Sequence, residues 1–510
     1  MKTSGKSKKP SSDTFGELFD LFTGLFVDLL IFIGKDILFP FFVFLFLKIS
    51  NAKIKSKKIV PIEYKMIHKK IKKKFEDEDL GFSINENRIV KNGEVDFSRH
   101  TILFGASGWG KTNLIKALIE RYVQRDTPTI YIDPKNSLED LQTFRKICTY
   151  YGKKFYIFSD SYIGEGAINL NPFRDDDVSQ NVQSLMSIFT WSDSFYQSRA
   201  QFYLMETFTY FATQDEVPDL GKIRDYVFNK FVDLKDAQGL VSQIEALYLS
   251  KLGQRLIDNK IRECKTLTEI IEEGAFVYIG LNKSAYKEFA KTVGKMLVNE
   301  VLMIAAYRSS VSINPKEDFN SFALITDETS SIIQSDFLDL ANKCRSSLIE
   351  LTCAFQSVSD LENVLNINEF FNILVECFSN YFIFRQSEKD NSEKLSSLVG
   401  TFSTEKKTRQ TDEDEKTDRG SARDVEKFYI HPNILKHMPL HKCVYISFGE
   451  WTKVHFLLPK NTDELLSSKV KISRPVLDQS KNIRASYSSL ALLKSQNKIM
   501  SKEANNELFN

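Results

Sequence analysis

The stretch that decides the fold is Gly105-Ala106-Ser107-Gly108-Trp109-Gly110-Lys111-Thr112. It has the GxxxxGK[ST] spacing of a phosphate-binding loop, follows the strand-like run 101–104 and precedes the amphipathic segment 114–122. In such a loop the glycines let backbone N–H groups surround phosphate oxygens, and the start of the next helix adds positive potential. Lys111 would reach the β- and γ-phosphates, and Thr112 would bind Mg²⁺. The loop therefore predicts a site for ATP or a related nucleotide with Mg²⁺.

A second acidic motif follows another strand-like run. The run 322–326 ends in Asp327 and Glu328. We expect Asp327 beside the Mg²⁺ and Glu328 positioned to polarise the attacking water. Two acids at a solvent-exposed strand end are the alternative interpretation, but the phosphate loop favours a hydrolytic site.

Further polar residues near strand ends complete the predicted site. Gln356 ends the run 348–355 and could sense the γ-phosphate, whereas a capping glutamine is the alternative. Arg345 precedes that run and is predicted to be an arginine finger supplied to a neighbouring subunit, with Arg385 as the competing residue and a surface arginine as the alternative. Asn282-Lys283 lacks the following aspartate of a guanine-reading motif, which argues against a GTPase. The predicted catalytic residues are Lys111, Glu328, Arg345 and Gln356.

The surrounding sequence predicts an α/β fold. Short apolar runs alternate with helical patterns, which is typical of a mostly parallel sheet. These runs are 101–104, 129–132, 276–281, 322–326, 348–354 and 381–384. Between about 183 and 268 helical spacings replace the strands and predict an all-α insertion. The polar segment 401–427 is expected to be a loop.

The N-terminus carries a membrane-anchor prediction. The tract 15–49 is rich in Phe and Leu, but charged residues interrupt it and Pro40 breaks it. Lysines on both sides keep both ends in the cytoplasm, so a tight membrane hairpin is favoured over a buried core hairpin. A cleavable signal peptide is disfavoured because no small-residue cleavage site follows.

Composition limits the other possibilities. The 510-residue chain has a net charge of +2, so nucleic-acid binding would depend on local basic patches. Its six cysteines are scattered without CxxC pairs, which argues against a zinc site or a disulfide framework.

Several further motifs occur in a characteristic order. They are Ile132-Asp-Pro-Lys135, Ile168-Asn-Leu-Asn-Pro-Phe173, Val277-Tyr-Ile-Gly-Leu281, Thr326-Asp-Glu328, Cys344-Arg345, Ala354-Phe-Gln356-Ser-Val-Ser-Asp-Leu361, Gly420-Ser421 and His431-Pro432. With the phosphate loop, they make the chain resemble type IV secretion coupling proteins over roughly residues 100–459. These are the TraD/TraG class of conjugative DNA-transfer ATPases in the FtsK/HerA group of RecA-like motors.

The resemblance implies a RecA-like P-loop motor with an all-α insertion domain and an N-terminal membrane-anchoring hairpin. It implies a homo-hexamer on the bacterial inner membrane with most of the chain in the cytoplasm. The expected ranges are 1–50 for the anchor, 51–99 for a basic linker, 100–182 and 269–460 for the motor, 183–268 for the insertion and 461–510 for a polar, disordered tail. Lys111, Thr112, Asp327, Glu328, Arg345 and Gln356 would occupy the nucleotide site, and Asp133 and Lys135 the motif after the second strand.

The expected function is a membrane-anchored ATPase that couples a relaxase attached to single-stranded DNA to a type IV secretion channel. Three alternatives stay open: a double-stranded DNA translocase or packaging ATPase, a coupling ATPase for protein effectors, and a docking platform that nucleotide merely stabilises. Two features depart from the family. The anchor leaves no room for a periplasmic domain, and the tail lacks the acidic end that some relatives use to bind an accessory protein.

Overall fold

The structure is a computed structural model of the chain. It describes Thr23 and residues 79–456, except 87, 92–98, 174–176, 334–336, 366–369, 413–414 and 448–449. The predicted anchor at 1–50, apart from Thr23, and the predicted tail at 461–510 lie outside these residues. Among the residues that the structure describes, no helix has both the length and the apolar character needed to cross a membrane. The chain divides into the units Met1–Phe75 and Glu76–Asn510, and the elements below belong to the second unit.

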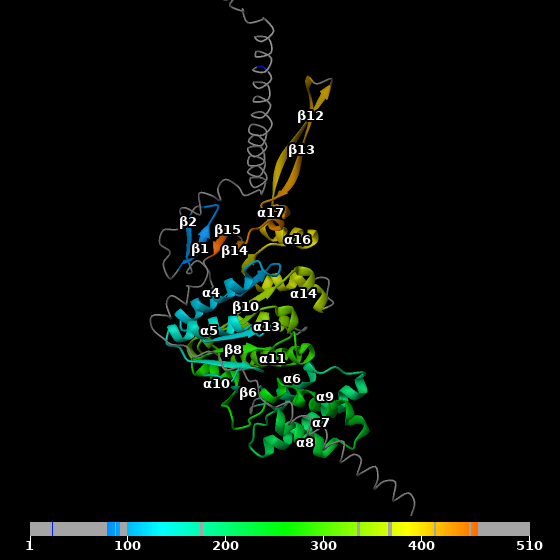
Figure 1. Cartoon of the computed structure of the whole chain (residues 1–510). Coiled ribbons are helices and arrows are strands. Elements are labelled where there is room, and N and C mark those ends of the chain that lie inside the picture. Colours follow the sequence, from blue (N-terminus) through cyan, green and yellow to red (C-terminus); the bar gives the residue numbers. More distant parts are fainter. Residues whose placement is uncertain are drawn as a thin grey trace, which may run out of the picture. The chain divides into compact units, whose positions relative to one another are not determined.

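A mixed sheet organises this unit (Figure 1). In the part of the chain that the structure describes, its eleven strands have the order β2 (Arg88–Lys91), β1 (Asp79–Ser83), β15 (Glu450–Phe456), β14 (Lys442–Ser447), β11 (Asn380–Ile383), β3 (Thr101–Phe104), β10 (Ile349–Phe355), β9 (Phe322–Thr326), β4 (Thr129–Asp133), β8 (Phe276–Gly280) and β5 (Phe155–Ser159). From β11 to β5 every neighbouring pair is parallel, and from β11 to β2 every pair is antiparallel. All the strand-like runs named above are strands, so the α/β prediction is confirmed.

Helices cover both faces of the sheet. The side chains of a strand alternate between faces, and in β3 Ile102 and Phe104 belong to one buried cluster whereas Leu103 belongs to the other. The cluster around Leu103 includes residues of α4 (Lys111–Gln124) and α5 (Leu138–Tyr150). The opposite cluster includes residues of α10 (Leu267–Glu272), α11 (Lys287–Val311), α13 (Phe337–Cys344), α14 (Val358–Leu365), α15 (Phe370–Cys377), α16 (Lys389–Val399) and α17 (Pro432–Lys436). Burial on two faces explains why the parallel strands are continuous apolar runs.

Helices also dominate the segment between the short strands β6 (Asn169–Leu170) and β7 (Cys264–Lys265), which pair in parallel. They are α6 (Val178–Ile188), α7 (Ser194–Thr213), α8 (Leu220–Phe231) and α9 (Gln238–Leu249), grouped in Figure 1. Side-chain oxygens of Asp177, Asp193 and Asp219 accept hydrogen bonds from backbone N–H groups at the starts of α6, α7 and α8. The helical spacing in this stretch therefore does correspond to helices.

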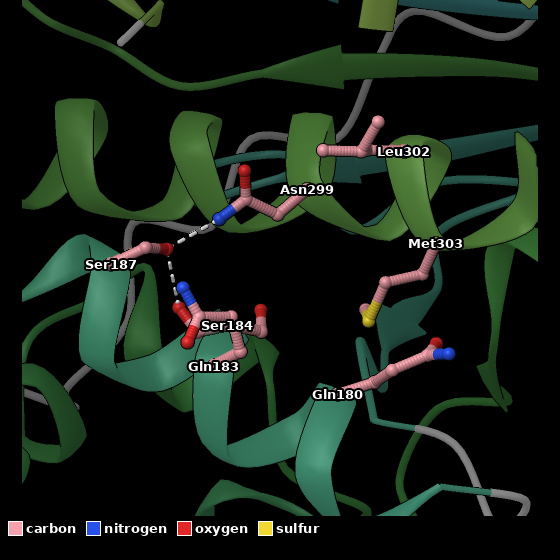
Figure 2. Close-up of a pocket in the computed structure, with 7 residues that line it drawn as sticks. All are labelled: Gln180, Gln183, Ser184, Ser187, Asn299, Leu302 and Met303. Carbon is pink, nitrogen blue, oxygen red and sulfur yellow. Dashed lines mark hydrogen bonds between the residues drawn. The ribbon is translucent and has the colours of Figure 1, made fainter. Parts of the chain in front are cut away.

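A polar contact joins α6 to α11. Asn299 Nδ2 donates to Ser187 Oγ at 2.6 Å, and Ser187 Oγ donates to the Ser184 carbonyl at 2.8 Å. Figure 2 shows these residues beside a small pocket between the two helices. The remaining residues that line it are Gln180, Gln183, Leu302 and Met303. None of the predicted site residues is among them.

The prediction of a loop at 401–427 is wrong. The segment forms a hairpin of β12 (Thr401–Asp412) and β13 (Glu415–Phe428) (Figure 1). Its sequence has no apolar face, which suggested a loop, but paired strands satisfy one another's backbone groups without a buried face. The strands β1 and β2 were also not anticipated, and they lie within the range expected to be a linker. β1 pairs with β15, so that Gly81 is opposite Phe456.

Candidate nucleotide-binding site

The phosphate loop runs from the end of β3 to the start of α4. Gly108 and Gly110 have φ of 79° and 109°, in the left-handed region that glycine adopts most readily. Gly105 lies against the next strand end, since an added Cβ would be 2.5 Å from Cβ of Phe384. The loop is also tied to both neighbouring strands: Gly105 N donates to the Phe355 carbonyl at 3.2 Å and Ala106 N to the Arg385 carbonyl at 3.0 Å. Its backbone shape is therefore set by the sheet.

Lys111 is the first residue of α4, and its side chain turns back along the loop. Its Nζ donates to the carbonyl oxygen of Gly105 and, at 3.2 Å, to that of Ala106. Burial lowers the pKa of Lys111, while the charge of Asp327 opposes this effect. The ammonium thus lies inside the curve of the loop, where a phosphate group would meet it.

Thr112 and Asp327 form the predicted metal-binding pair. Thr112 Oγ1 donates to Asp327 Oδ2 at 2.9 Å, and Asp327 is only 1% exposed. The backbone of Asp327 is fixed by a hydrogen bond from its N–H to the Ile132 carbonyl. A hydroxyl and a carboxylate oxygen at one point are hard oxygen donors of the kind that Mg²⁺ prefers. The two residues therefore fit a Mg²⁺ ion that also contacts substrate phosphates.

Glu328 lies at the junction of three polar side chains. Its backbone has φ of 45°, which is uncommon for a residue other than glycine. Gln356 Nε2 donates to Glu328 Oε1 at 3.3 Å, and Lys135 Nζ lies 3.0 Å from the same oxygen. Lys283 Nζ is 3.9 Å from Oε2. The structure thus brings Gln356 and Glu328 together, as their positions after β10 and β9 suggested.

Asp133 explains how Lys135 reaches the site. The Asp133 carboxylate accepts hydrogen bonds from the N–H groups of Lys135 and Ser137 at 2.9 and 2.8 Å, and from the Tyr278 hydroxyl at 2.6 Å. Burial raises the pKa of Asp133, and these hydrogen bonds oppose the shift. Asp133 therefore shapes the turn after β4 that directs Lys135 toward Asp327 and Glu328. Sequence reasoning assigned no role to this pair, although Asp133 ends a strand of the parallel sheet and Lys135 lies just after it.

The two arginines lie in different places. Arg385 follows β11, and its guanidinium carbon lies 4.3 Å from the ring centroid of Trp109, a cation–π contact at the phosphate loop. Arg345 is exposed and precedes β10, at the opposite end of the strand from Gln356. The site of this chain thus brings together Lys111, Thr112, Asp327, Glu328 and Gln356 but does not include Arg345.

Two protein families match the sequence. A family described as the TraM recognition site of TraD and TraG matches residues 321–439. A family described as the central domain of the helicase HerA matches residues 87–271, which include the phosphate loop. No curated protein matches the sequence.

Solved structures share the fold. The unbound monoclinic form of the bacterial conjugative coupling protein TrwBdeltaN70 matches with a TM-score of 0.56 and 16% identity, over 77% of this chain and 91% of that one. TrwB in complex with ADP and Mg²⁺ gives 0.53 and 16%, over 77% and 92%. VirB4 of Thermoanaerobacter pseudethanolicus gives 0.51 and 13%, over 75% and 97%. The two family matches and these shared folds thus make the chain similar to the coupling proteins TraD, TraG and TrwB, with a motor fold like that of HerA.

Proposed function

We propose that this chain is a membrane-anchored ATPase that couples a relaxase attached to single-stranded DNA to a type IV secretion or conjugation channel and drives transfer by ATP hydrolysis. The observation that carries the proposal is the hydrogen bond between Thr112 and Asp327. It joins the phosphate loop to the acidic pair on a fold shared with TrwB. The relation to TraD and TraG supports the choice of conjugative transfer over other uses of this motor fold.

Each residue then has a chemical role. The backbone of Gly105 to Gly110 and the Lys111 ammonium hold the phosphates, while Thr112 and Asp327 hold the Mg²⁺. Bound Mg²⁺ supplies charge neutralisation at the phosphate oxygens. Glu328 polarises the attacking water, and Gln356 beside it responds to the γ-phosphate. TrwB, the fold relative, was solved with ADP and Mg²⁺, which supports these cofactors for this chain.

Assembly is part of the same proposal. Arg345 lies away from the site of its own chain, so its role as an arginine finger requires a neighbouring subunit, in keeping with a homo-hexameric ring. We assign residues 100–182 and 269–460 to the motor, 183–268 to an all-α domain that receives the DNA–relaxase substrate, and 1–50 to an anchor in the bacterial inner membrane. Basic side chains in the ring would hold DNA through salt-sensitive phosphate contacts that do not read the base sequence.

The test is ATP hydrolysis by full-length protein purified in mild detergent, with single-stranded DNA, duplex DNA or no DNA. We expect single-stranded DNA to give the largest stimulation and Lys111→Ala to remove turnover. A preference for duplex DNA would instead favour a translocase, and indifference to DNA with a co-purifying adaptor would favour effector export. A Lys111→Ala protein that still supports transfer would show that the chain is only a docking platform.

A further inference from the structure

One side chain bridges both carboxylates of the acidic pair, and it carries an inference that rests on the proposed function. Lys135 Nζ lies 3.0 Å from Glu328 Oε1 and 3.6 Å from Asp327 Oδ2. It reaches them from the turn after β4, a strand that neighbours β9 in the sheet. Its side chain is 46% exposed, whereas those of Asp327 and Glu328 are 1% and 14% exposed. Lys135 therefore approaches a buried charge from the solvent side.

The Asp327 oxygen near Lys135 is also the one bonded to Thr112. Oδ2 accepts from Thr112 Oγ1 at 2.9 Å, so it is the oxygen that would share a Mg²⁺ ion with that hydroxyl. An ammonium 3.6 Å from this oxygen would repel a divalent cation bound there, because like charges at such separations interact strongly near a protein interior. Lys135 and Mg²⁺ are thus competitors for one carboxylate.

The surroundings give Lys135 room to move while its backbone stays fixed. An open cleft beside the acidic pair is lined by Lys135, Lys283, Ser284, Lys287 and Glu328. The Lys135 N–H is held by Asp133, and the Lys283 N–H donates to the Pro134 carbonyl at 2.7 Å. The first bond stays within the turn after β4, and the second connects this turn to the one after β8. The side chain can therefore leave Asp327 without a movement of the turn, and its shorter contact, to Glu328, can persist.

We infer that Lys135 is a positioning residue that holds the Glu328 carboxylate and competes with Mg²⁺ for Asp327. With a Mg²⁺ ion held by Thr112 and Asp327, Lys135 would contact Glu328 alone and would hold this general base in position. This support matters because Lys135 is the nearest partner of the Glu328 carboxylate, which without it would sample other orientations. A poorly oriented base lowers the rate of the chemical step.

The inference predicts opposite effects on binding and on turnover. In Lys135→Ala, the Mg²⁺ concentration that half-saturates ADP binding should fall about fivefold, the size expected for loss of a partly exposed ion pair. In the same variant kcat should fall about tenfold or more. Lys135→Arg keeps the charge and should keep the Mg²⁺ requirement close to that of the unaltered protein. The measurements are calorimetric titration of ADP at a series of Mg²⁺ concentrations and steady-state ATP hydrolysis.

Lys287→Ala is the matched control, because Lys287 lines the same cleft with the same charge. Lys287→Ala should change the Mg²⁺ requirement by less than twofold. This result would distinguish the specific contact of Lys135 from the general positive charge of the cleft. Equal effects of Lys135→Ala and Lys287→Ala, or an unchanged Mg²⁺ requirement in Lys135→Ala, would overturn the inference while leaving the proposed ATPase intact. Absence of any Mg²⁺-dependent nucleotide binding by the unaltered, folded protein would overturn both.

Discussion

The hydroxyl of Thr112 donates a 2.9 Å hydrogen bond to Oδ2 of Asp327, although the two residues are separated by 215 positions in the chain. The bond spans from the phosphate loop after β3 to the end of β9, with β10 between these strands in the sheet. It turns two separate sequence motifs into a single pair of oxygen donors.

Replacing Thr112 by Val keeps the shape of the side chain but removes the hydroxyl. We expect turnover to fall about a hundredfold and the Mg²⁺ requirement to rise, because one of two protein donors to the metal is lost. Steady-state hydrolysis across a Mg²⁺ series measures both effects. Thr112→Ser retains the hydroxyl and should retain most activity; equal losses in the two variants would show that the methyl group, not the hydroxyl, matters.

Glu328→Gln separates binding from chemistry. The amide keeps the size of the side chain but cannot accept a proton from water, so turnover should fall by a factor of about 10² to 10⁴. Nucleotide affinity should change little, because Thr112, Lys111 and Asp327 are untouched. Calorimetry and hydrolysis on one preparation give both numbers. Near-normal turnover would show that another group activates the water.

Arg345→Ala should abolish turnover and spare nucleotide binding if, as we propose, the residue acts on the site of a neighbouring subunit. Its position beyond the amino end of β10 makes a mixing experiment decisive. Arg345→Ala and Lys111→Ala proteins are each inactive, but in mixed rings an intact Lys111 can face an intact Arg345, so activity should reappear. Lys343→Ala, which removes a nearby exposed charge, is the control and should stay active. Failure of the mixture to recover would remove Arg345 from the trans-acting role.

Trp109 should report nucleotide binding. Its ring stacks with Arg385, whose buried Nε has no hydrogen-bond partner among the described residues. A bound phosphate would attract the Arg385 guanidinium and so change the surroundings of the Trp109 ring. Tryptophan emission should therefore change when Mg²⁺ and ADP are added. Trp109→Phe should lose the signal while Trp191 and Trp451 still emit. A signal that persists in Trp109→Phe would place the change elsewhere.

His100 should make stability depend on pH. The His100 ring is buried. Its Nε2 lies 3.0 Å from the Ala341 carbonyl oxygen, and its Nδ1 accepts a hydrogen bond from the Leu351 N–H at 3.3 Å. Burial lowers its pKa from 6.5 to about 4, so the folded protein keeps the ring neutral while the unfolded chain takes up a proton. The free energy of unfolding therefore falls as pH drops from 6.5 toward 4, by about 3 kcal/mol from this residue, and the contribution stays constant below that.

Chemical denaturation at about pH 7 and pH 5 measures this effect. His100→Gln should be less stable at neutral pH but lose less stability on acidification, because it has no proton to gain. An equal acid-induced loss in both proteins would assign the pH dependence to other groups.

The sequence predicted the parts of the fold that depend on continuous burial. The parallel strands from β11 to β8 are mostly apolar because both of their faces are covered, and each was predicted from its own sequence, whereas the parallel edge strand β5 was not. β14 and β15 are antiparallel, β15 has alternating exposed and buried residues, and the β12–β13 hairpin has no apolar face. Their pairing depends on partners far away in the chain, which local patterns do not specify.

Some residues of the site could likewise be predicted from local sequence, and others could not. The phosphate loop is a local motif, and the structure connects Gln356 with Glu328, so these residues were found from spacing and strand ends. Lys135 was noticed, but its contact depends on β4 lying beside β9, and that strand order is a property of the whole sheet. The distance of Arg345 from its own site likewise followed only from the direction of β10.

The antiparallel pairing of β1 with β15 places Gly81 opposite Phe456. Paired Cα atoms in such a ladder are roughly 5 Å apart, so the first strand of the sheet in chain order begins beside the end of the last one. Tension applied to the chain just before Asp79 would therefore load the same two strands as tension applied just after Phe456. A load on either end would therefore act on a strand pair that borders the phosphate loop, because the Phe456 ring lies against Gly110.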